Sequence, residues 1–259
     1  MQTQSSTQDV MSTSKLTARM AANRQASRDF DEWCIRQLPE LPMPARVLDL
    51  GCGTGKQLHL FAPLLSPNSE IWGMDLSEKS LLELEANYRG AADLNVVAGS
   101  FDEAGSFEEM EAESFDLIYG SYALYYTKDL PALVERAFEL LKPGGVFWNV
   151  SPYFGTNDEF LNIIRPLHEV EPFMDYVFDE FHQDILKLGE AQGFRSNKAA
   201  LLRNAVPFAT AEAFLTYLSN SLFYRPGHDE AILSEVNKVV EMEGQFRVSK
   251  NVISLQLRK

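Results

Sequence analysis

The chain has 259 residues, of which 37 are acidic and 23 basic, so its formal net charge is −14 at pH 7. Hydrophobic residues make up 45% and aromatic residues 11% of the chain, which indicates a globular protein with a sizeable core and excludes a disordered one. The negative charge disfavours nucleic acid as a partner, because no local basic patch is available to neutralise phosphates, and small neutral or cationic partners fit better.

The N-terminal region divides into two parts. Residues 1–15 are mostly Gln, Ser and Thr, without the basic and apolar regions of a secretory signal, and we expect a disordered tail. Residues 16–41 have a helical pattern, with Phe30 and Trp33 as expected anchors, and are interpreted as a helical lid.

Cysteine content and hydropathy bear on location. Nowhere does the sequence approach the roughly eighteen uninterrupted apolar residues of a membrane helix, so no membrane partner is expected. The two cysteines, Cys34 and Cys52, and the four scattered histidines lack the spacing of metal ligands. We expect a cytoplasmic protein with reduced thiols and no metal site.

Between Arg46 and Val150, short apolar runs alternate with longer amphipathic segments. This alternation predicts β-α-β units and a mostly parallel sheet. The expected strands are residues 47–50, 71–75, 95–98, 115–119 and 146–150. Ser77 is expected to cap one helix, and a helix over residues 130–142 should end at Pro143-Gly144-Gly145.

Beyond Val150 the pattern becomes helical and rich in aromatic residues. Helices are expected over residues 180–192, 210–218 and 228–243, and strands near Leu201 and over residues 252–257. The two late strands complete a seven-stranded Rossmann-like sheet of the α/β class with helices on both faces. The expected domains are a tail (1–15), a ligand-binding core with its N-terminal lid (16–150), and a third part (151–259) that holds a helical cap, over about 151–245, and the last strands.

Three glycines at alternate positions, Gly51, Gly53 and Gly55, directly follow the first expected strand. They allow a tight turn and close approach of a ligand to the backbone at the carboxyl end of the sheet. A dinucleotide fingerprint would require glycine in place of Lys56, and a P-loop would require Ser or Thr in place of Gln57. The sequence therefore satisfies neither phosphate-binding motif.

Asp75 follows Gly55 by twenty residues and ends the second expected strand. A carboxylate at this position can accept hydrogen bonds from both hydroxyls of a ribose. The spacing thus predicts a ligand that contains adenosine.

The stretch Val47-Leu48-Asp49-Leu50-Gly51-Cys52-Gly53-Thr54-Gly55 resembles motif I of the class I S-adenosylmethionine-dependent methyltransferases, which commonly reads V-L-D-L-G-C-G-T-G. Further similarities follow in the family's order over roughly residues 46–150, at 73–77, 97–102, 115–118 and 141–145. The resemblance implies S-adenosylmethionine as the cofactor, S-adenosylhomocysteine as the product and a small-molecule methyl acceptor. Residues 208–250 are loosely similar to the C-terminal parts of bacterial small-molecule methyltransferases.

The resemblance also implies the roles of individual residues. It places the amino-acid end of the cofactor over Gly51–Gly55, with the ammonium near Asp49, although Asp49 could also serve only to cap the turn. Adenine would be read either by the carboxylate of Asp102 or by the backbone of Phe101. The complete expected set for the cofactor is Asp49, Gly51, Cys52, Gly53, Gly55, Gln57, Asp75, Leu76, Ser100, Phe101, Asp102 and Gly120.

Methyl transfer from a sulfonium is an in-line displacement, so the protein mainly aligns the nucleophile and excludes water. A general base matters only when the acceptor is protonated, and His168, in the cap, is the candidate. Tyr125, after the fourth strand, is the second expected catalytic residue and should line the substrate pocket. Two other functions stay open: a catalytically silent S-adenosylmethionine-binding regulatory protein, and a different S-adenosylmethionine-using reaction on the same fold. The sequence leaves the acceptor and the oligomeric state undefined.

Overall fold

A computed structural model of the chain describes residues 25–259, apart from the side chains of Ser196 and Asn197. The expected disordered tail and residues 16–24 of the expected N-terminal helix lie outside the described residues. The chain divides into two compact units. The core unit contains Asp31–Pro152, Asp179–Leu202 and Val252–Lys259, and the second unit contains Tyr153–Phe178 and Arg203–Asn251 together with residues 25–30.

A seven-stranded sheet forms the centre of the core unit, with the strand order β3-β2-β1-β4-β5-β9-β6. Its strands are β1 (Arg46–Leu50), β2 (Glu70–Asp75), β3 (Asp93–Ala98), β4 (Phe115–Ser121), β5 (Leu141–Pro152), β6 (Ser196–Leu202) and β9 (Val252–Arg258). The first five strands are parallel, whereas β9 runs antiparallel to both β5 and β6. This confirms the expected α/β class and the mostly parallel sheet that the two late strands complete.

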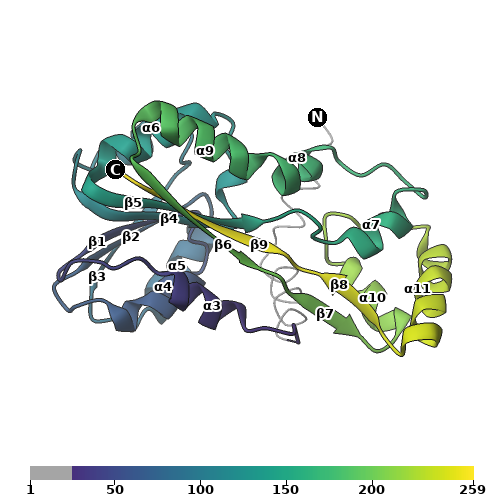
Figure 1. The fold of residues 1–259 in the computed structure, drawn as a ribbon. Coiled ribbons are helices and arrows are strands. Elements are labelled where there is room, and N and C mark those ends of the chain that lie inside the picture. Colours follow the sequence, from purple (N-terminus) through teal and green to yellow (C-terminus); the bar gives the residue numbers. More distant parts are fainter. Residues whose placement is uncertain (1–24) are drawn as a thin grey trace. The chain divides into compact units, whose positions relative to one another are not determined.

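Helices lie on both faces of this sheet. Those of the core unit are α3 (Phe30–Gln37), α4 (Lys56–Phe61), α5 (Glu78–Asn87), α6 (Leu130–Leu140) and α9 (Phe181–Gln192), with short 3-10 turns η1 (Ala62–Leu64), η2 (Ala104–Phe107) and η3 (Leu124–Tyr126). Helices α6 and α9 pack side by side on one face, and α3, α4 and α5 cover the other (Figure 1). Within the described part of the chain, none of the helices combines the length and apolar character needed to cross a bilayer.

Helix ends follow local sequence signals. The Ser77 hydroxyl accepts a hydrogen bond of 3.2 Å from the amide of Ser80, as expected of an N-cap at the start of α5. Helix α9 ends at Gly193, which has φ of 110°. Helix α6 ends at Leu140, two residues earlier than predicted, because Leu141 already pairs with Phe115 in the sheet.

The N-terminal range expected to be helical is described only from residue 25 onward. Of the range 16–41, only α3, from Phe30 to Gln37, is helical among the described residues. The prolines Pro39, Pro42 and Pro44 follow directly, and proline removes a backbone donor and disfavours helix in the residue before it. The anchor Trp33 is buried, whereas Phe30 is half-buried.

The second unit has a small sheet of its own that the sequence did not predict. Strands β7 (Ala205–Phe208) and β8 (Phe246–Ser249) pair antiparallel, and helices α7 (Asp158–Ile164), α8 (Phe173–Asp179), α10 (Ala211–Leu218) and α11 (Asp229–Glu243) make up most of the rest. Within residues 151–245, α9 belongs to the core unit, and so does β6, which was expected to complete the sheet. The interior of the second unit is aromatic, with the ring of Phe214 in contact with those of Phe160, Phe208 and Phe246.

Candidate functional site

The glycine loop joins β1 to α4 and is fastened to the end of β2. The amides of Gly51 and Cys52 both donate to the carbonyl of Met74, at 2.8 and 3.0 Å. Gly51, Gly53 and Gly55 have φ values of 75°, 54° and 78°, in the left-handed region that residues with a side chain rarely adopt. The fold of this loop therefore depends on all three glycines.

The glycines differ in what surrounds them. A Cβ on Gly51 would lie 2.4 Å from Cβ of Ala123, and one on Gly55 would lie 2.3 Å from Cδ1 of Leu84. A Cβ on Gly53 would meet no atom of the protein within 4 Å. Gly51 and Gly55 thus permit close packing inside the protein, while Gly53 leaves a stretch of backbone open to a ligand.

Asp75 holds this loop in place. Its Oδ2 accepts a hydrogen bond of 2.8 Å from the amide of Gly53, and its Oδ1 accepts one of 2.8 Å from the amide of Ser77. The neighbouring Leu76 is 76% exposed, although it is large and apolar. Asp75 and Leu76 therefore present a carboxylate and an apolar side chain together beside the open backbone of Gly53.

Asp49 has a buried and incompletely bonded carboxyl. The side chain is 2% exposed, and its Oδ2 has no hydrogen-bond partner among the described residues. Burial, and secondly the negative charge of Asp75, raise the pKa of Asp49 to about 8. A cationic group placed against Asp49 would satisfy this oxygen and favour its ionised form.

Cys52 and Gln57 lie in and beside the loop. Cys52 is buried, and its Sγ would lie 3.0 Å from a Cβ on Gly73, so the thiol fills space between the loop and β2. Burial, and then the charges of Asp49 and Asp75, raise the pKa of the Cys52 thiol, which keeps it protonated and unreactive. Gln57 is half-buried in the first turn of α4.

The loop after β3 carries the residues expected near adenine. The ring of Phe101 reaches the glycine loop, with Cε1 at 3.8 Å from the position of a Cβ on Gly51. The Ser100 hydroxyl accepts a hydrogen bond of 3.1 Å from the amide of Asp102. The Asp102 carboxylate accepts hydrogen bonds from the hydroxyl of Thr127, at 2.5 Å, and from the amide of Lys128, at 3.1 Å.

The end of β4 and the segment after it contain the two remaining expected residues of the core unit, Gly120 and Tyr125. Gly120 is buried, and a Cβ there would lie 2.5 Å from Cδ2 of Leu124, so its role in the structure is close packing. The ring of Tyr125 is 6% exposed and packs against Tyr126 and, edge to face, against Phe181. The structure thus brings the expected cofactor residues together at the carboxyl edge of the sheet, with Gly120 behind them as a packing position.

Two residues of this region were not recognised from the sequence as part of the site. Ala123 packs against Gly51, and Thr127 is hydrogen-bonded to Asp102. The sequence carries a weak signal for Thr127, because Thr127 and Asp129 directly precede α6. Threonine and aspartate favour the N-termini of helices. The small side chain of Ala123 carries no signal in one sequence.

His168 lies in the second unit, whereas Tyr125 lies in the core unit. Its Nε2 is 2.9 Å from the carbonyl of Phe223, and since a carbonyl only accepts, Nε2 carries the hydrogen. In the neutral ring Nδ1 is therefore a base, and this atom is buried without a partner among the described residues. The ring stacks on that of His228, with centroids 5.3 Å apart.

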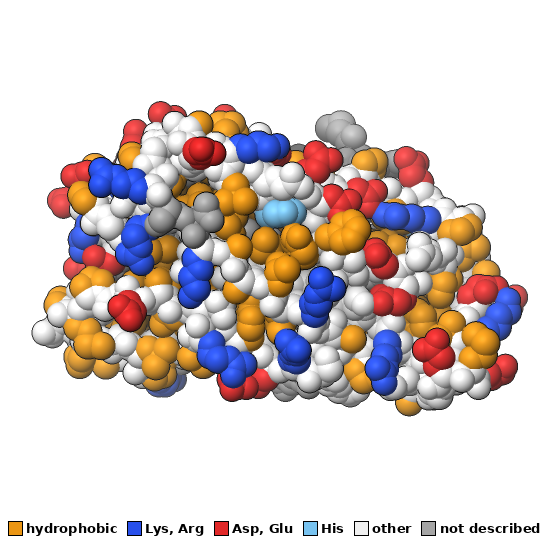
Figure 2. All heavy atoms as spheres, viewed as in Figure 1, with side chains coloured by type: hydrophobic (Ala, Val, Ile, Leu, Met, Phe, Trp, Pro, Cys, Tyr) orange, Lys and Arg blue, Asp and Glu red, His pale blue; other side chains and the backbone are white. Residues whose placement is uncertain are grey.

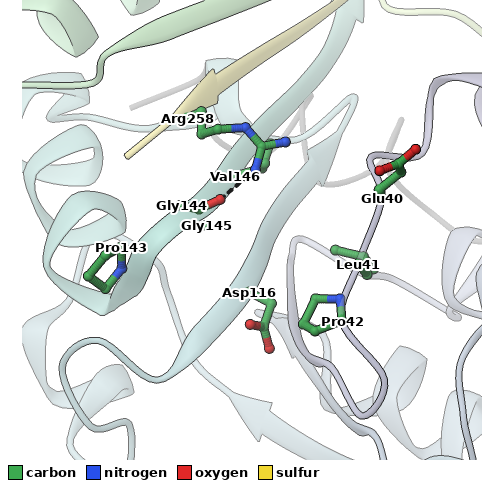
Figure 3. A pocket seen from close by; sticks show the side chains of 9 residues that line it. All are labelled: Glu40, Leu41, Pro42, Asp116, Pro143, Gly144, Gly145, Val146 and Arg258. Carbon is green, nitrogen blue, oxygen red and sulfur yellow. Dashed lines mark hydrogen bonds between the residues drawn. The ribbon is translucent and has the colours of Figure 1, made fainter.

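A cavity of about 200 Å³ lies at the opposite edge of the sheet (Figure 3). It is lined by Glu40, Leu41, Pro42, Asp116, Pro143, Gly144, Gly145, Val146 and Arg258. Its principal charged groups already have partners: Arg258 donates to the carbonyl of Gly144, and Asp116 accepts from Lys142 and from the amide of Arg46. None of the expected site residues lines this cavity, which is a structural feature of the sheet edge.

Acidic and basic side chains are interspersed on the face of the molecule shown in Figure 2. Within residues 25–259, no group of three or more His, Cys, Asp or Glu side chains is arranged to hold a metal ion. At the carboxyl edge, the groups that a ligand could contact include carboxylates, the open backbone at Gly53 and aromatic rings.

Comparison with known proteins identifies relatives of this central region. Residues 48–147 match the model of a family described as "Methyltransferase domain". The chain is 38% identical over 109 residues to trans-aconitate 2-methyltransferase of Deinococcus radiodurans, which covers 42% of this chain and 38% of that protein. It is 29% identical over 118 residues to arsenite methyltransferase of Aquipseudomonas alcaligenes, which covers 43% of this chain and 34% of that protein.

Likeness of structure extends further along the chain. A solved structure from Bacillus halodurans has a TM-score of 0.61 at 18% identity and covers 89% of this chain and 99% of its own. In sequence, by contrast, the chain spans little more than a third of the length of each of the two curated relatives above. Those two relatives act on chemically different molecules, so their names define no common acceptor.

Proposed function

Because residues 48–147 form a domain of the class I S-adenosylmethionine-dependent methyltransferase superfamily, we propose that this chain binds S-adenosylmethionine at the carboxyl edge of its sheet and methylates a small-molecule acceptor. The observation that carries the proposal is the buried carboxyl of Asp49, whose Oδ2 has no partner among the described residues. A cationic ligand group would complete its bonding. The ammonium of the methionine moiety has the required charge.

The other residues of the edge fit the rest of this cofactor. Asp75 is suited to the ribose hydroxyls, and the backbone at Gly53 is open to the amino-acid end. Exposed Leu76 and the ring of Phe101 offer apolar contacts to adenine. A carboxylate, an open glycine and two apolar side chains therefore match the chemistry of the cofactor from end to end.

The bound cofactor supplies a methyl group activated by a positively charged sulfur. What remains for the chain is to orient the acceptor and to exclude water, and such positioning can contribute on the order of 7–11 kcal/mol. An acceptor that is protonated at working pH also needs a base. His168, through its buried Nδ1, is one candidate, and Tyr125 is the other.

We propose that the second unit is the substrate cap and that the acceptor is neutral or cationic. Two of the arginines of this unit, Arg165 and Arg225, already have partners. Arg165 pairs with Asp175, and Arg225 donates to the carbonyls of Leu222 and Tyr224. The net charge of −14 acts in the same direction.

The test of the cofactor is calorimetry with S-adenosylmethionine and S-adenosylhomocysteine. Wild-type protein and the control Asp93→Ala, an exposed carboxylate at the start of β3, should bind with micromolar affinity. Asp49→Asn and Asp75→Ala should each lose at least about tenfold, equivalent to about 1.4 kcal/mol. No binding by the wild-type protein, or equal binding by all variants, would contradict the proposal.

Product analysis tests transfer itself. Mixtures of the protein, S-adenosylmethionine and candidate amines, phenols and carboxylates should yield S-adenosylhomocysteine and a methylated product by mass spectrometry. Binding without turnover across these acceptors would favour the catalytically silent regulatory protein. A chimaera in which the second unit is replaced should methylate a different acceptor. If the choice of acceptor were unchanged, the second unit would not be the substrate cap.

The location of the protein is part of the proposal. Cys34 and Cys52 form no disulfide, and both are buried as thiols. Reduced thiols support the cytoplasm as its compartment, and fractionation of cells that express the protein tests this.

A further inference from the structure

The Asp102 carboxylate joins two loops that are distant in sequence. Asp102 lies after β3, and its Oδ1 accepts hydrogen bonds from the Thr127 hydroxyl at 2.5 Å and from the Lys128 amide at 3.1 Å, both after β4. We call this set of two hydrogen bonds the Asp102 bridge. One oxygen thus fastens the loop expected beside adenine to the segment that carries Tyr122 and Tyr125.

Each end of the bridge is fixed further. On one side, the amide of Asp102 donates to the hydroxyl of Ser100 at 3.1 Å. On the other, the hydroxyl of Thr127 accepts from the amide of Asp129 at 3.2 Å, and Asp129 caps α6 through the amide of Ala132. The hydrogen bonds therefore run without interruption from the loop after β3 to the first turn of α6.

Packing connects the same two loops to the glycine loop. A Cβ on Gly51 would lie 2.4 Å from Cβ of Ala123 and 3.8 Å from Cε1 of Phe101. Gly51 thus packs against Ala123 from one of the bridged loops and lies near the ring of Phe101 from the other. We expect a displacement of the loop after β3 by a ligand to be transmitted to the segment after β4 through the bridge.

The segment after β4 also holds a strained backbone. Tyr122 has φ of 55°, 41% of its surface is exposed, and its amide donates to the carbonyl of Val150 at 2.8 Å. A bulky residue in this conformation costs about 1–3 kcal/mol and persists only where its surroundings hold it. The Asp102 bridge is one of the contacts that hold this segment.

We propose that Asp102 is a positioning residue whose bridge couples cofactor occupancy at the loop after β3 to the position of the tyrosines after β4. This inference rests on the proposed function. The bridge occupies Oδ1 of Asp102, and the proposal therefore assigns the reading of adenine to the backbone of Phe101. Coupling of this kind is reciprocal, so the bridge should respond to the ligand and the ligand to the bridge.

Matched variants isolate the bridge. Asp102→Ala and Thr127→Val break it, whereas Asp102→Asn keeps an accepting oxygen and Thr127→Ser keeps the donating hydroxyl. Glu103→Ala is the control, since it removes the same charge from the adjacent, exposed position. The probe is S-adenosylhomocysteine, with affinity measured by calorimetry and amide hydrogen exchange at Tyr126, Thr127 and Lys128 measured by NMR.

In the wild-type, Glu103→Ala, Asp102→Asn and Thr127→Ser proteins, S-adenosylhomocysteine should slow exchange at the three amides by at least about fivefold. In Asp102→Ala and Thr127→Val, this slowing should disappear, and affinity should fall by the same coupling factor, about fivefold. A loss of affinity of about tenfold or more in Asp102→Ala alone would show that Asp102 binds adenine itself and would overturn the proposal. Undiminished slowing in Asp102→Ala would overturn it as well.

Failure of the proposed function gives a different result. If the wild-type protein does not bind S-adenosylhomocysteine, the bridge is judged without ligand from the exchange of the Lys128 amide. That amide should then exchange faster in Asp102→Ala than in Glu103→Ala, because only the first variant removes its acceptor. Equal exchange rates in these two variants would overturn the bridge.

Discussion

The negative charge of Asp75 acts on the buried carboxyl of Asp49 and, after burial itself, is the second cause that raises the pKa of Asp49 to about 8. Asp49 on β1 pairs with Gly73 on β2, and Gly73 precedes Asp75 by two residues. Asp75 is bonded to the amides of Gly53 and Ser77, whereas Oδ2 of Asp49 lacks a partner among the described residues. The two carboxyls therefore differ in role: Asp75 fixes the loop, and Asp49 is available to a cation.

The buried carboxyl of Asp49 should make stability depend on pH. Its pKa rises from 3.8 to about 8, so between these values the folded protein holds a proton that the unfolded chain has released. The contribution of Asp49 to stability is thus fully present below about pH 4 and is lost as the pH rises through about 8. Asp49→Asn should increase the free energy of unfolding by about 2–4 kcal/mol at pH 8 and by much less at pH 5.

Urea unfolding at the two pH values measures this difference. Asp93→Asn, which neutralises an exposed carboxylate on β3, is the control and should show no such change between pH 5 and pH 8. If Asp49→Asn were equally stable relative to wild type at both pH values, the carboxyl of Asp49 would not be protonated in the folded protein.

Cofactor binding should release a proton from Asp49. A cationic group beside the carboxyl lowers its pKa, so at pH 7 binding of S-adenosylmethionine should expel close to one proton. Calorimetry in buffers of different ionisation enthalpy counts the protons released. Asp49→Asn should bind more weakly and release none, and identical proton release in this variant would exclude a contact between Asp49 and the ammonium.

The glycines of the loop should separate folding from binding. Gly51→Ala places a Cβ 2.4 Å from Ala123 and should lower stability by about 2–4 kcal/mol. Gly53→Ala meets no atom within 4 Å and should cost only about 1–2 kcal/mol of backbone strain, yet weaken S-adenosylhomocysteine binding by at least about tenfold.

Gly144→Ala is the control for this pair. Gly144 has φ of 84° and no atom within 4 Å of a Cβ position, as at Gly53, but it lies at the other end of the sheet. The melting temperatures of Gly144→Ala and Gly53→Ala, measured by thermal unfolding, should be similar. The ligand affinity of Gly144→Ala, measured by calorimetry, should equal that of the wild-type protein. Equal ligand affinity in Gly53→Ala and Gly144→Ala would mean that no ligand approaches the backbone at Gly53.

His168→Gln tests the candidate base. Glutamine can keep the hydrogen bond to the carbonyl of Phe223 but has no basic ring nitrogen. Methylation of an acceptor that must lose a proton should fall at least about a hundredfold, with S-adenosylhomocysteine affinity unchanged. His228→Gln, which alters only the stacked neighbour, is the comparison, and equal rates in the two variants would assign His168 a structural role.

Elements that depend on near neighbours could be predicted well. Strands β1 to β4 extend the predicted ranges by a few residues at most, Ser77 begins α5 as expected, and α9 ends at Gln192 as predicted. The pairing of β7 with β8 was missed, because it joins Ala205 to Ser249 across a long intervening segment and neither strand has a strong pattern. The assignment of α9 to the core unit was missed for the same reason, since membership of a unit depends on distant contacts, whereas β6 was expected to complete the sheet.

The sequence by itself determined the glycine loop, the acidic residue at the end of β2 and the α/β order of elements. The left-handed backbone at glycines, the lengths of strands and the caps of helices each depend on only a few neighbouring residues. Only the tertiary structure decided that Oδ2 of Asp49 is buried without a partner and that Asp102 is bonded to Thr127 and Lys128. Burial and the choice of hydrogen-bond partner depend on segments brought together by the sheet. The residue types proposed to contact the cofactor could therefore be predicted from one sequence, whereas their burial and their hydrogen-bond partners could not.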